Sequence, residues 1–559
     1  MKSREILTLQ LGNYANYVGT HFWNIQEAGF QYEPGSGIPE INHDVLFREG
    51  QNHRGDVTYT PRMLCVDLKG ALVHLSEDGD LYGDESRKKI LSGGSDALNP
   101  QIPWDSQSIE VVREEAAEKP TFQKDLDTTG QANVQGDYEF RNTVKSWTDF
   151  MYTRYHPRSV NVIREYSHSD EENSFDTFTN GRELWKSGSF GEDFGDKIRQ
   201  YIEECDNCQG FQVLFDCTDG FSGLTAQCFD DLNDEYGKCI LAYPLIPPQV
   251  RNFKNADSAV TSQIRVVNLS LSFASLIESS SLFVPVSTMA QGWRNVSGSR
   301  QFPNVSYDPE NFYQTSAILA TFLDTLTLKY RAKDILQPMV LSEFCADLNA
   351  YGLKMCSGNL GLPFDMPLLE SVSDGLDQYR PSSIFTHLTP NSEVSRGLTM
   401  QTVIRGIHRS QIYSKDSRED PQSLESSIFP YGAANFKLQQ HLGSFGCANA
   451  VPVMTLQSPM PVKVPYPGEI FAKTLNATGH VTGYLREEGT RMISIPVLAS
   501  VSSTKHLMGT IESLHVEAEK VKLGKMCRFK ETGLESDEYS EVLNKLLDFR
   551  DLYDDRVNL

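Results

Sequence analysis

The sequence has no apolar run long enough to cross a membrane. A membrane-spanning helix needs roughly 20 consecutive apolar residues, and no segment of the 559-residue chain approaches that length. Residues 1–12 also lack the basic start and long apolar stretch of a secretion signal. We therefore expect a cytosolic protein without a transmembrane segment.

Basic residues are scarce compared with acidic ones. The chain has 51 lysines and arginines against 74 aspartates and glutamates, which gives a net charge of −23. Such a surface repels phosphates, so it disfavours sequence-independent binding of nucleic acid and docking on anionic lipid by charge alone. We expect protein partners and no nucleic acid.

Cysteines are few and scattered, with ten in the whole chain. This spacing favours free thiols in a reducing compartment over a disulfide framework. Cys205 and Cys208 form a C-x-x-C pair, but no second pair follows at zinc spacing, so we interpret both as packing residues. His43, His53 and His74 are interpreted as surface or core residues, and no metal site is predicted.

Catalytic motifs are also absent: the sequence contains no Ser/His/Asp motif, H-E-x-x-H or Walker loop. What it does contain is an alternation of strands and helices. Residues 4–11 predict a buried strand, followed by a glycine-containing loop over 12–19 and then a helix. The same pattern continues with strands at 63–68, 211–217 and 239–245 and a helix at 222–236. This alternation predicts a parallel sheet covered by helices.

The composition changes over residues 77–150, which hold sixteen acidic and eight basic residues. We predict an acidic, partly disordered insertion there, exposed and mobile. It falls within an N-terminal domain over 1–265. A second α+β domain is expected over 266–470, with strands around Val340 and at 399–404, and a C-terminal region over 471–559 with helices at 506–522 and 535–553.

Five blocks of the sequence resemble tubulin, in tubulin's order. They are Arg4-Glu5-Ile6 with Gln10, Gly12, Asn16, Gly19 and Phe22-Trp23; Tyr59-Thr-Pro-Arg62 with Val66-Asp67-Leu68; Cys205-Asp-Asn-Cys208-Gln-Gly-Phe-Gln212; Asn268-x-x-Leu271-Ser272 with Leu276-Ile-Glu278; and Arg396-Gly-Leu-Thr-Met400. With its acidic insertion and reduced glycine loop, the chain resembles the Misato family of the tubulin/FtsZ superfamily. The resemblance implies a tubulin/FtsZ-like α/β fold: a parallel-sheet, nucleotide-binding-type N-terminal domain, an α+β second domain and C-terminal helices.

The same resemblance locates a nucleotide site that has lost part of its pattern. Gly12 and Asn16 match the first tubulin loop, but Ala15 replaces a glycine. Where tubulin has G-G-G-T-G-S-G, this chain has the shorter run Cys217-Thr-Asp-Gly-Phe-Ser-Gly223. Asp216 and Asp219 would each repel a phosphate charge by roughly 1–4 kcal/mol. We therefore predict a vestigial nucleotide site, with Ser222 as a helix cap. Its residues would be Gly12, Asn16, Gly220, Ser222 and Gly223.

Two other nucleotide-site positions implied by the resemblance also differ from tubulin. Asp67 could hold a magnesium-bound water, but Lys69-Gly70 replaces the nearby acid of tubulin. Thr288 falls where tubulin has a purine-contacting asparagine.

A further block, from Tyr307 to Asn311, resembles the loop that precedes tubulin's intersubunit catalytic acid. The acid positions fall at Tyr313 and Ser316, neither of which is a carboxylate. The simpler interpretation of this segment is a helix start, with Pro309 in the first turn.

The resemblance implies a non-catalytic tubulin-like protein that regulates mitochondrial distribution and morphology, including fusion and network formation, through protein interactions. We expect no cofactor, and a location in the cytoplasm and, peripherally, on the cytosolic face of the mitochondrial outer membrane. Two alternatives stay open. One is a divergent GTP-binding protein or slow GTPase, for which GTP would be the cofactor. The other is an accessory factor for tubulin or microtubules that works with the cytosolic chaperonin.

Overall fold

The computed structural model describes most of the chain. The described residues are 4–30, 39–51, 55, 57–75, 118–129, 138–168, 170, 173–248, 257–294, 297–333, 336, 338–364, 384–392, 397–407, 439–440, 452–482 and 484–555. His53, and residues 77–117 and 130–137 of the predicted insertion, lie outside these ranges.

Six parallel strands form the first sheet, in the order β5-β4-β1-β6-β7-β8. They are β1 (Ile6–Leu11), β4 (Met63–Lys69), β5 (Val160–Ser167), β6 (Gly210–Asp216), β7 (Cys239–Leu245) and β8 (Leu282–Phe283). Every residue of β1 and β6 is buried, as expected for strands covered on both faces. The predicted parallel sheet is confirmed.

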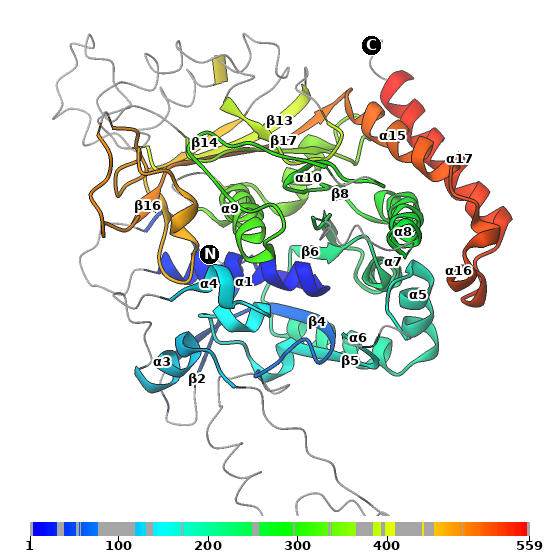
Figure 1. Ribbon diagram of the computed structural model, residues 1–559, viewed down its shortest axis with the longest axis horizontal. Coiled ribbons are helices and arrows are strands. Elements are labelled where there is room, and N and C mark those ends of the chain that lie inside the picture. The colour runs from blue at the N-terminus through cyan, green and yellow to red at the C-terminus, as the bar shows by residue number, and fades with distance from the viewer. Residues whose placement is uncertain are drawn as a thin grey trace, which may run out of the picture.

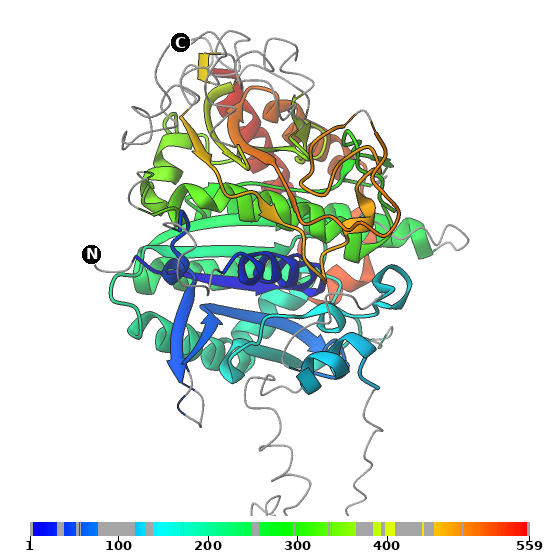
Figure 2. The same ribbon diagram turned by 90° about the vertical axis from the view of Figure 1, so that its left-hand side faces the viewer.

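Helices cover both faces of this sheet (Figure 1). On one face lie α1 (Asn13–Ala28) and α9 (Phe312–Arg331), and on the other α5 (Phe178–Ser187), α6 (Phe190–Glu203), α7 (Gly220–Tyr236) and α8 (Asp257–Ser279). The hydroxyl of Tyr330, near the end of α9, donates to Gln212 of β6 over 2.6 Å. Because α9 also packs on the second sheet, this helix joins the two sheets (Figure 2).

The second sheet has the order β12-β11-β17-β13-β14 and is antiparallel except between β13 and β14. Its strands are β11 (Ser357–Gly361), β12 (Thr386–His387), β13 (Gly397–Arg405), β14 (Val453–Leu456) and β17 (Val497–Thr504). The central strand β17 lies beyond the predicted domain end at 470, and β8 lies beyond the predicted boundary at 265. Both boundaries therefore require correction, because the chain returns to each sheet from the next region.

Two helices near the C-terminus pack against α8, as Figure 1 shows: α15 (Leu507–Glu519) and α17 (Ser536–Asp555). They confirm the two predicted terminal helices. Leu546 and Tyr553 of the predicted apolar stripe are buried, and the Tyr553 hydroxyl donates to the carbonyl of Met355 over 2.7 Å.

The remaining elements are short. They are β2 (Phe47–Gln51), β3 (Val57–Pro61), β9 (Met289–Gln291), β10 (Ser297–Ser299), β15 (Met460–Pro461), β16 (Ser494–Ile495), α3 (Thr121–Thr129), α4 (Phe140–Thr143), α10 (Leu341–Leu348) and α16 (Cys527–Glu531), with 3₁₀ turns at His43–Val45, Trp147–Phe150, Pro157–Ser159, Gly468–Ile470 and Leu523–Lys525.

Three local predictions are corrected by these elements. Helix α1 begins at Asn13, so residues 13–19 are helical and only Gly12 belongs to a loop. Residues around Val340 are not a strand, because Val340 immediately precedes α10. Residues 118–129 and 138–150 of the predicted insertion pack into the fold, since Phe122, Trp147 and Phe150 are buried. The acidic composition of the segment predicted exposure, although its aromatic residues are buried.

A buried ion network joins α9 to the second sheet. Asp324 of α9 accepts from Arg331 over 2.7 Å and from Arg405 of β13 over 2.5 Å. All three side chains are almost completely buried. The single carboxylate therefore compensates two cations that have no access to water.

We predict that Asp324→Asn lowers the free energy of unfolding by about 3–5 kcal/mol, because removing one partner of a buried ion pair leaves uncompensated charge. Urea denaturation measures this difference. The matched control is Asp196→Asn, which removes an exposed partner of Arg199 and should change stability by less than about 1 kcal/mol. Equal, small effects of the two variants would contradict a structural role for the network.

Candidate functional site

The candidate site lies where the carboxyl ends of β1, β4 and β6 meet the N-termini of α1 and α7. Ligands of open α/β sheets bind at this edge, and free amides at helix N-termini attract anions. Whether a phosphate can bind here depends on what those amides already contact.

The first turn of α1 is occupied by a carboxylate of the chain itself. Asp216, the last residue of β6, accepts from the backbone amides of Tyr14 and Ala15, each over 2.9 Å. Gly12 has φ 121°, and a Cβ there would lie 2.5 Å from Asp216 Oδ2. Gly12 is thus required for the close approach of an internal anion to the amides that would otherwise face a phosphate.

The N-terminus of α7 is satisfied in the same way. Asp219 accepts from the amide of Phe221 over 3.0 Å, and the amide of Gly220 donates to the carbonyl of Phe175 over 3.1 Å. The hydroxyl of Ser222 donates to the carbonyl of Asp219 over 2.6 Å. The predicted cap is therefore corrected: Asp219 caps α7, and Ser222 donates to the capping residue.

The predicted site glycines of α7 lie in a tight contact between helices. A Cβ on Gly223 would lie 1.7 Å from the carbonyl oxygen of Phe178 in α5, and one on Gly220 would lie 2.8 Å from the ring of Phe175. Conversely, a Cβ on Gly181 of α5 would lie 1.8 Å from the carbonyl oxygen of Gly220. Both α7 glycines are explained by the packing of α5 and the segment before it, without a ligand.

Asn268 of α8 holds this covering segment in place. Its side-chain amide donates to the carbonyls of Asp176 (2.6 Å) and Thr218 (2.8 Å), and its oxygen accepts from the amide of Phe178 (2.8 Å). Asn268 lies in one of the tubulin-like sequence blocks. It fixes the segment 174–178 to the loop that enters α7.

Asp67, the candidate magnesium-site residue, is surrounded by donors. It accepts from Asn16 Nδ2 (3.0 Å), Asn13 Nδ2 (3.3 Å), Trp147 Nε1 (2.9 Å) and the amide of Leu68 (2.9 Å). Asn16 also donates to the carbonyl of Val66. Trp147 falls in the segment predicted as an acidic insertion, so its bond to Asp67 was not predicted.

The residue before α9 is likewise hydrogen-bonded within the fold. Asn311 caps this helix by accepting from the amide of Gln314 over 3.3 Å, and its Nδ2 donates to the carbonyl of Arg141 over 2.9 Å. Since α9 begins at Phe312, the helix-start interpretation holds, but Pro309 precedes the first turn.

The two positions that match the family's catalytic acid are buried. Tyr313 donates to the carbonyl of Pro465 over 2.6 Å, and the hydroxyl of Ser316 donates to a backbone carbonyl within α9. Thr288, at the purine position, is also buried.

The three carboxyl groups at this sheet edge have raised pKa values. Burial is the main cause for Asp67, Asp216 and Asp219, and it raises the pKa of Asp219 to about 7. The neighbouring Asp219 raises the pKa of Asp216 further, while its two amide donors oppose the rise. A phosphate here would add negative charge to a buried acidic cluster.

Comparison with known proteins identifies the family. Residues 4–128 match the model of the Misato Segment II tubulin-like domain, and residues 139–332 match that of a tubulin domain. The chain is 38% identical to Protein misato of Drosophila melanogaster, over 99% of each chain. The chain belongs to the Misato family. It is also 31% identical to Protein misato homolog 1 of Mus musculus over 97% of each chain, and 32% identical to Protein DML1 of Phaeosphaeria nodorum over 59% of each chain.

In the described part of this Misato-family chain, no group of three or more His, Cys, Asp or Glu side chains is arranged to hold a metal ion. The thiol of Cys205 donates to the carbonyl of Tyr201 over 3.2 Å. The ring of His43 lies against that of Phe30 in a tilted arrangement, and burial lowers the pKa of His43 to about 3. His74 is buried 3.6 Å from Asp149. Each of these side chains has a local structural contact.

We predict that Asp219→Asn makes the Misato-family protein more stable at pH 8 than the unsubstituted chain. The folded pKa of Asp219 is about 7, whereas an unfolded aspartate titrates near 3.9. Between these values the folded state holds a proton that the unfolded state has released, so the unfolding free energy falls as pH rises.

Asparagine caps helices as well as aspartate and does not titrate. Because Asp219 retains some exposure, we expect a gain of roughly 1–2 kcal/mol at pH 8 and little change at pH 4. Urea denaturation at both pH values measures it, with Asp196→Asn as the exposed control. If the stability change caused by Asp219→Asn were less favourable at pH 8 than at pH 4, the raised pKa of Asp219 would be contradicted.

Proposed function

We propose that this Misato-family chain is a non-catalytic tubulin-like protein that acts through protein interactions. The observation that supports it is the pairing of Asp216 with the amides of Tyr14 and Ala15. A nucleotide phosphate at this helix end would displace two hydrogen bonds to a carboxylate, each worth about 1.5–3 kcal/mol. It would also meet Asp219, with a repulsion of roughly 1–4 kcal/mol.

The proposed process is the regulation of mitochondrial distribution and morphology, including fusion and network formation. Its support is membership of the Misato family, which is linked to mitochondrial distribution and morphology and to microtubule and chaperonin-related roles. The proposed partners are proteins, among them the cytosolic chaperonin or tubulin, and the proposed location is the cytoplasm and the cytosolic face of the mitochondrial outer membrane. The strongly acidic composition, with a net charge of −23, suits basic protein surfaces.

Any membrane attachment is proposed to be peripheral. Among the described residues, one helical stretch, Ala259–Ser279 of α8, is long and apolar enough to cross a membrane. Its most apolar window is 72% buried within the fold, where α8 packs against α7, α15 and α17. Withdrawing α8 would uncover the helical layer on this face of the first sheet, so we assign it to the core.

We predict that guanine nucleotides bind weakly or not at all. Fluorescent GTP titrated with magnesium into low-micromolar full-length protein should give no saturable change in anisotropy, because the phosphate-facing amides are already bonded. Tubulin serves as the positive control. A tight, saturable isotherm selective for GTP over ATP would contradict the proposal and favour the divergent GTP-binding alternative.

For the membrane, we predict that alkaline carbonate releases the protein from isolated mitochondria into the supernatant. High pH disrupts polar protein contacts but does not extract a helix from the bilayer. An integral outer-membrane protein in the same sample should stay in the pellet. If this chain also stays in the pellet, the assignment of α8 to the protein core is wrong.

A further inference from the structure

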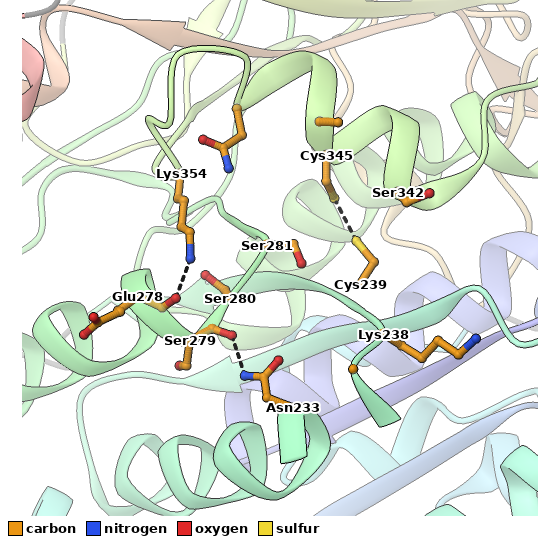
Figure 3. A pocket seen from close by; sticks show the side chains of 13 residues that line it. Asn233, Lys238, Cys239, Glu278, Ser279, Ser280, Ser281, Ser342, Cys345 and Lys354 are labelled. Carbon is orange, nitrogen blue, oxygen red and sulfur yellow. Dashed lines mark hydrogen bonds between the residues drawn. The ribbon is translucent and has the colours of Figure 1, made fainter. Parts of the chain in front are cut away.

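A cavity lies beside the first sheet, at the edge opposite the acidic cluster (Figure 3). It has a volume of about 630 Å³ and is bounded by the end of α7, the start of β7 and α10. Two cysteines, Cys239 and Cys345, are among its lining residues, with Ser281 and Lys354. None of the candidate nucleotide-site residues lines this cavity.

The two cysteine sulfurs face each other from different elements. Cys239 is the first residue of β7 and is half-buried, whereas Cys345 lies in α10 and is buried. Their Sγ atoms are 3.3 Å apart, as the dashed line in Figure 3 marks. A disulfide bond is about 2.05 Å long, so an approach of roughly 1 Å would join them.

The surroundings distinguish the two thiols. The hydrogen bond with Cys345 lowers the pKa of Cys239, with a smaller contribution from Ser281, against the effect of burial. The same pairing and burial raise the pKa of Cys345 well above its ordinary value. Since the thiolate is the reactive form, Cys239 is suited to react first and Cys345 to keep its proton until a second step.

We propose that Cys239 and Cys345 are a redox-active dithiol that hydrogen peroxide converts to an intramolecular disulfide. The Cys239 thiolate attacks one peroxide oxygen, the O–O bond breaks, and the products are a sulfenic acid and, after protonation, water. The Cys345 sulfur then attacks the sulfenic sulfur. The S–S bond forms, the S–O bond breaks, and the thiol proton leaves with the hydroxide as water. In total, two thiols and one peroxide give one disulfide and two waters.

The bond would link the two sheets. Helix α10 packs against β7 of the first sheet and against β13 and β17 of the second. The cysteines are 106 positions apart in sequence, so the disulfide closes a long loop and restricts the relative movement of the layers. This device is independent of the nucleotide site.

Peptide mapping of the full-length native protein tests the proposal. After brief treatment with hydrogen peroxide and alkylation of the remaining thiols, trypsin cuts after Lys238, Arg251, Lys333 and Lys354. Cys239 and Cys345 then lie in the peptides 239–251 and 334–354, separate from the peptide that holds Cys205 and Cys208. We expect these two peptides to be the main disulfide-linked pair, and dithiothreitol to separate them. Linkage only in urea-denatured protein, or no linkage, would overturn the proposal.

Two variants test the order of the steps. Cys345→Ser lacks the second thiol, so the sulfenic acid on Cys239 should persist and labelling of peptide 239–251 by dimedone should rise severalfold. Cys239→Ser should abolish both linkage and labelling. Cys527→Ser removes an exposed cysteine and should leave the linkage unchanged. Equal dimedone labelling in Cys345→Ser and the unsubstituted protein would contradict the assignment of Cys239 as the first to react.

Discussion

A helix that begins at the buried edge of a parallel sheet needs acceptors for its first backbone amides, because an unpaired buried amide costs about 1–3 kcal/mol. In nucleotide-binding folds a phosphate often supplies them. Here Asp216 does so for α1, and Asp219 together with the carbonyl of Phe175 does so for α7. The arrangement of this edge of the fold depends on that internal pairing.

The neighbouring residues follow from the same pairing. The segment 174–178 can cross the start of α7 only where glycines leave room, and Asn268 fixes it there with three hydrogen bonds. On the other side, Trp147 fills the space beside Asp67 and donates to its carboxylate. Groups that a ligand would contact are therefore bonded to one another, at both ends of the acidic cluster.

Much of the fold was accessible from the sequence. The apolar runs that became β1, β6 and β7 are buried on both faces, which leaves a strong local signal. The predicted loop over 12–19 is wrong beyond Gly12, because α1 begins at Asn13. Gly19 is in fact needed for packing, since a Cβ there would lie 1.7 Å from the Gln10 side chain. The bonds of Trp147 to Asp67 and of Asp216 to α1 join residues that are distant in sequence. Local pattern cannot reveal them.

We propose that internal groups take the place of a nucleotide in this Misato-family protein. The most direct measurement is the nucleotide content of the freshly purified full-length chain, released by denaturation and separated by chromatography against tubulin prepared in parallel. We expect guanine nucleotide far below one molecule per chain, while tubulin releases its bound nucleotide in the same procedure. Close to one GTP or GDP per chain would contradict it, because no such ligand could be retained while Asp216 keeps the amides of Tyr14 and Ala15.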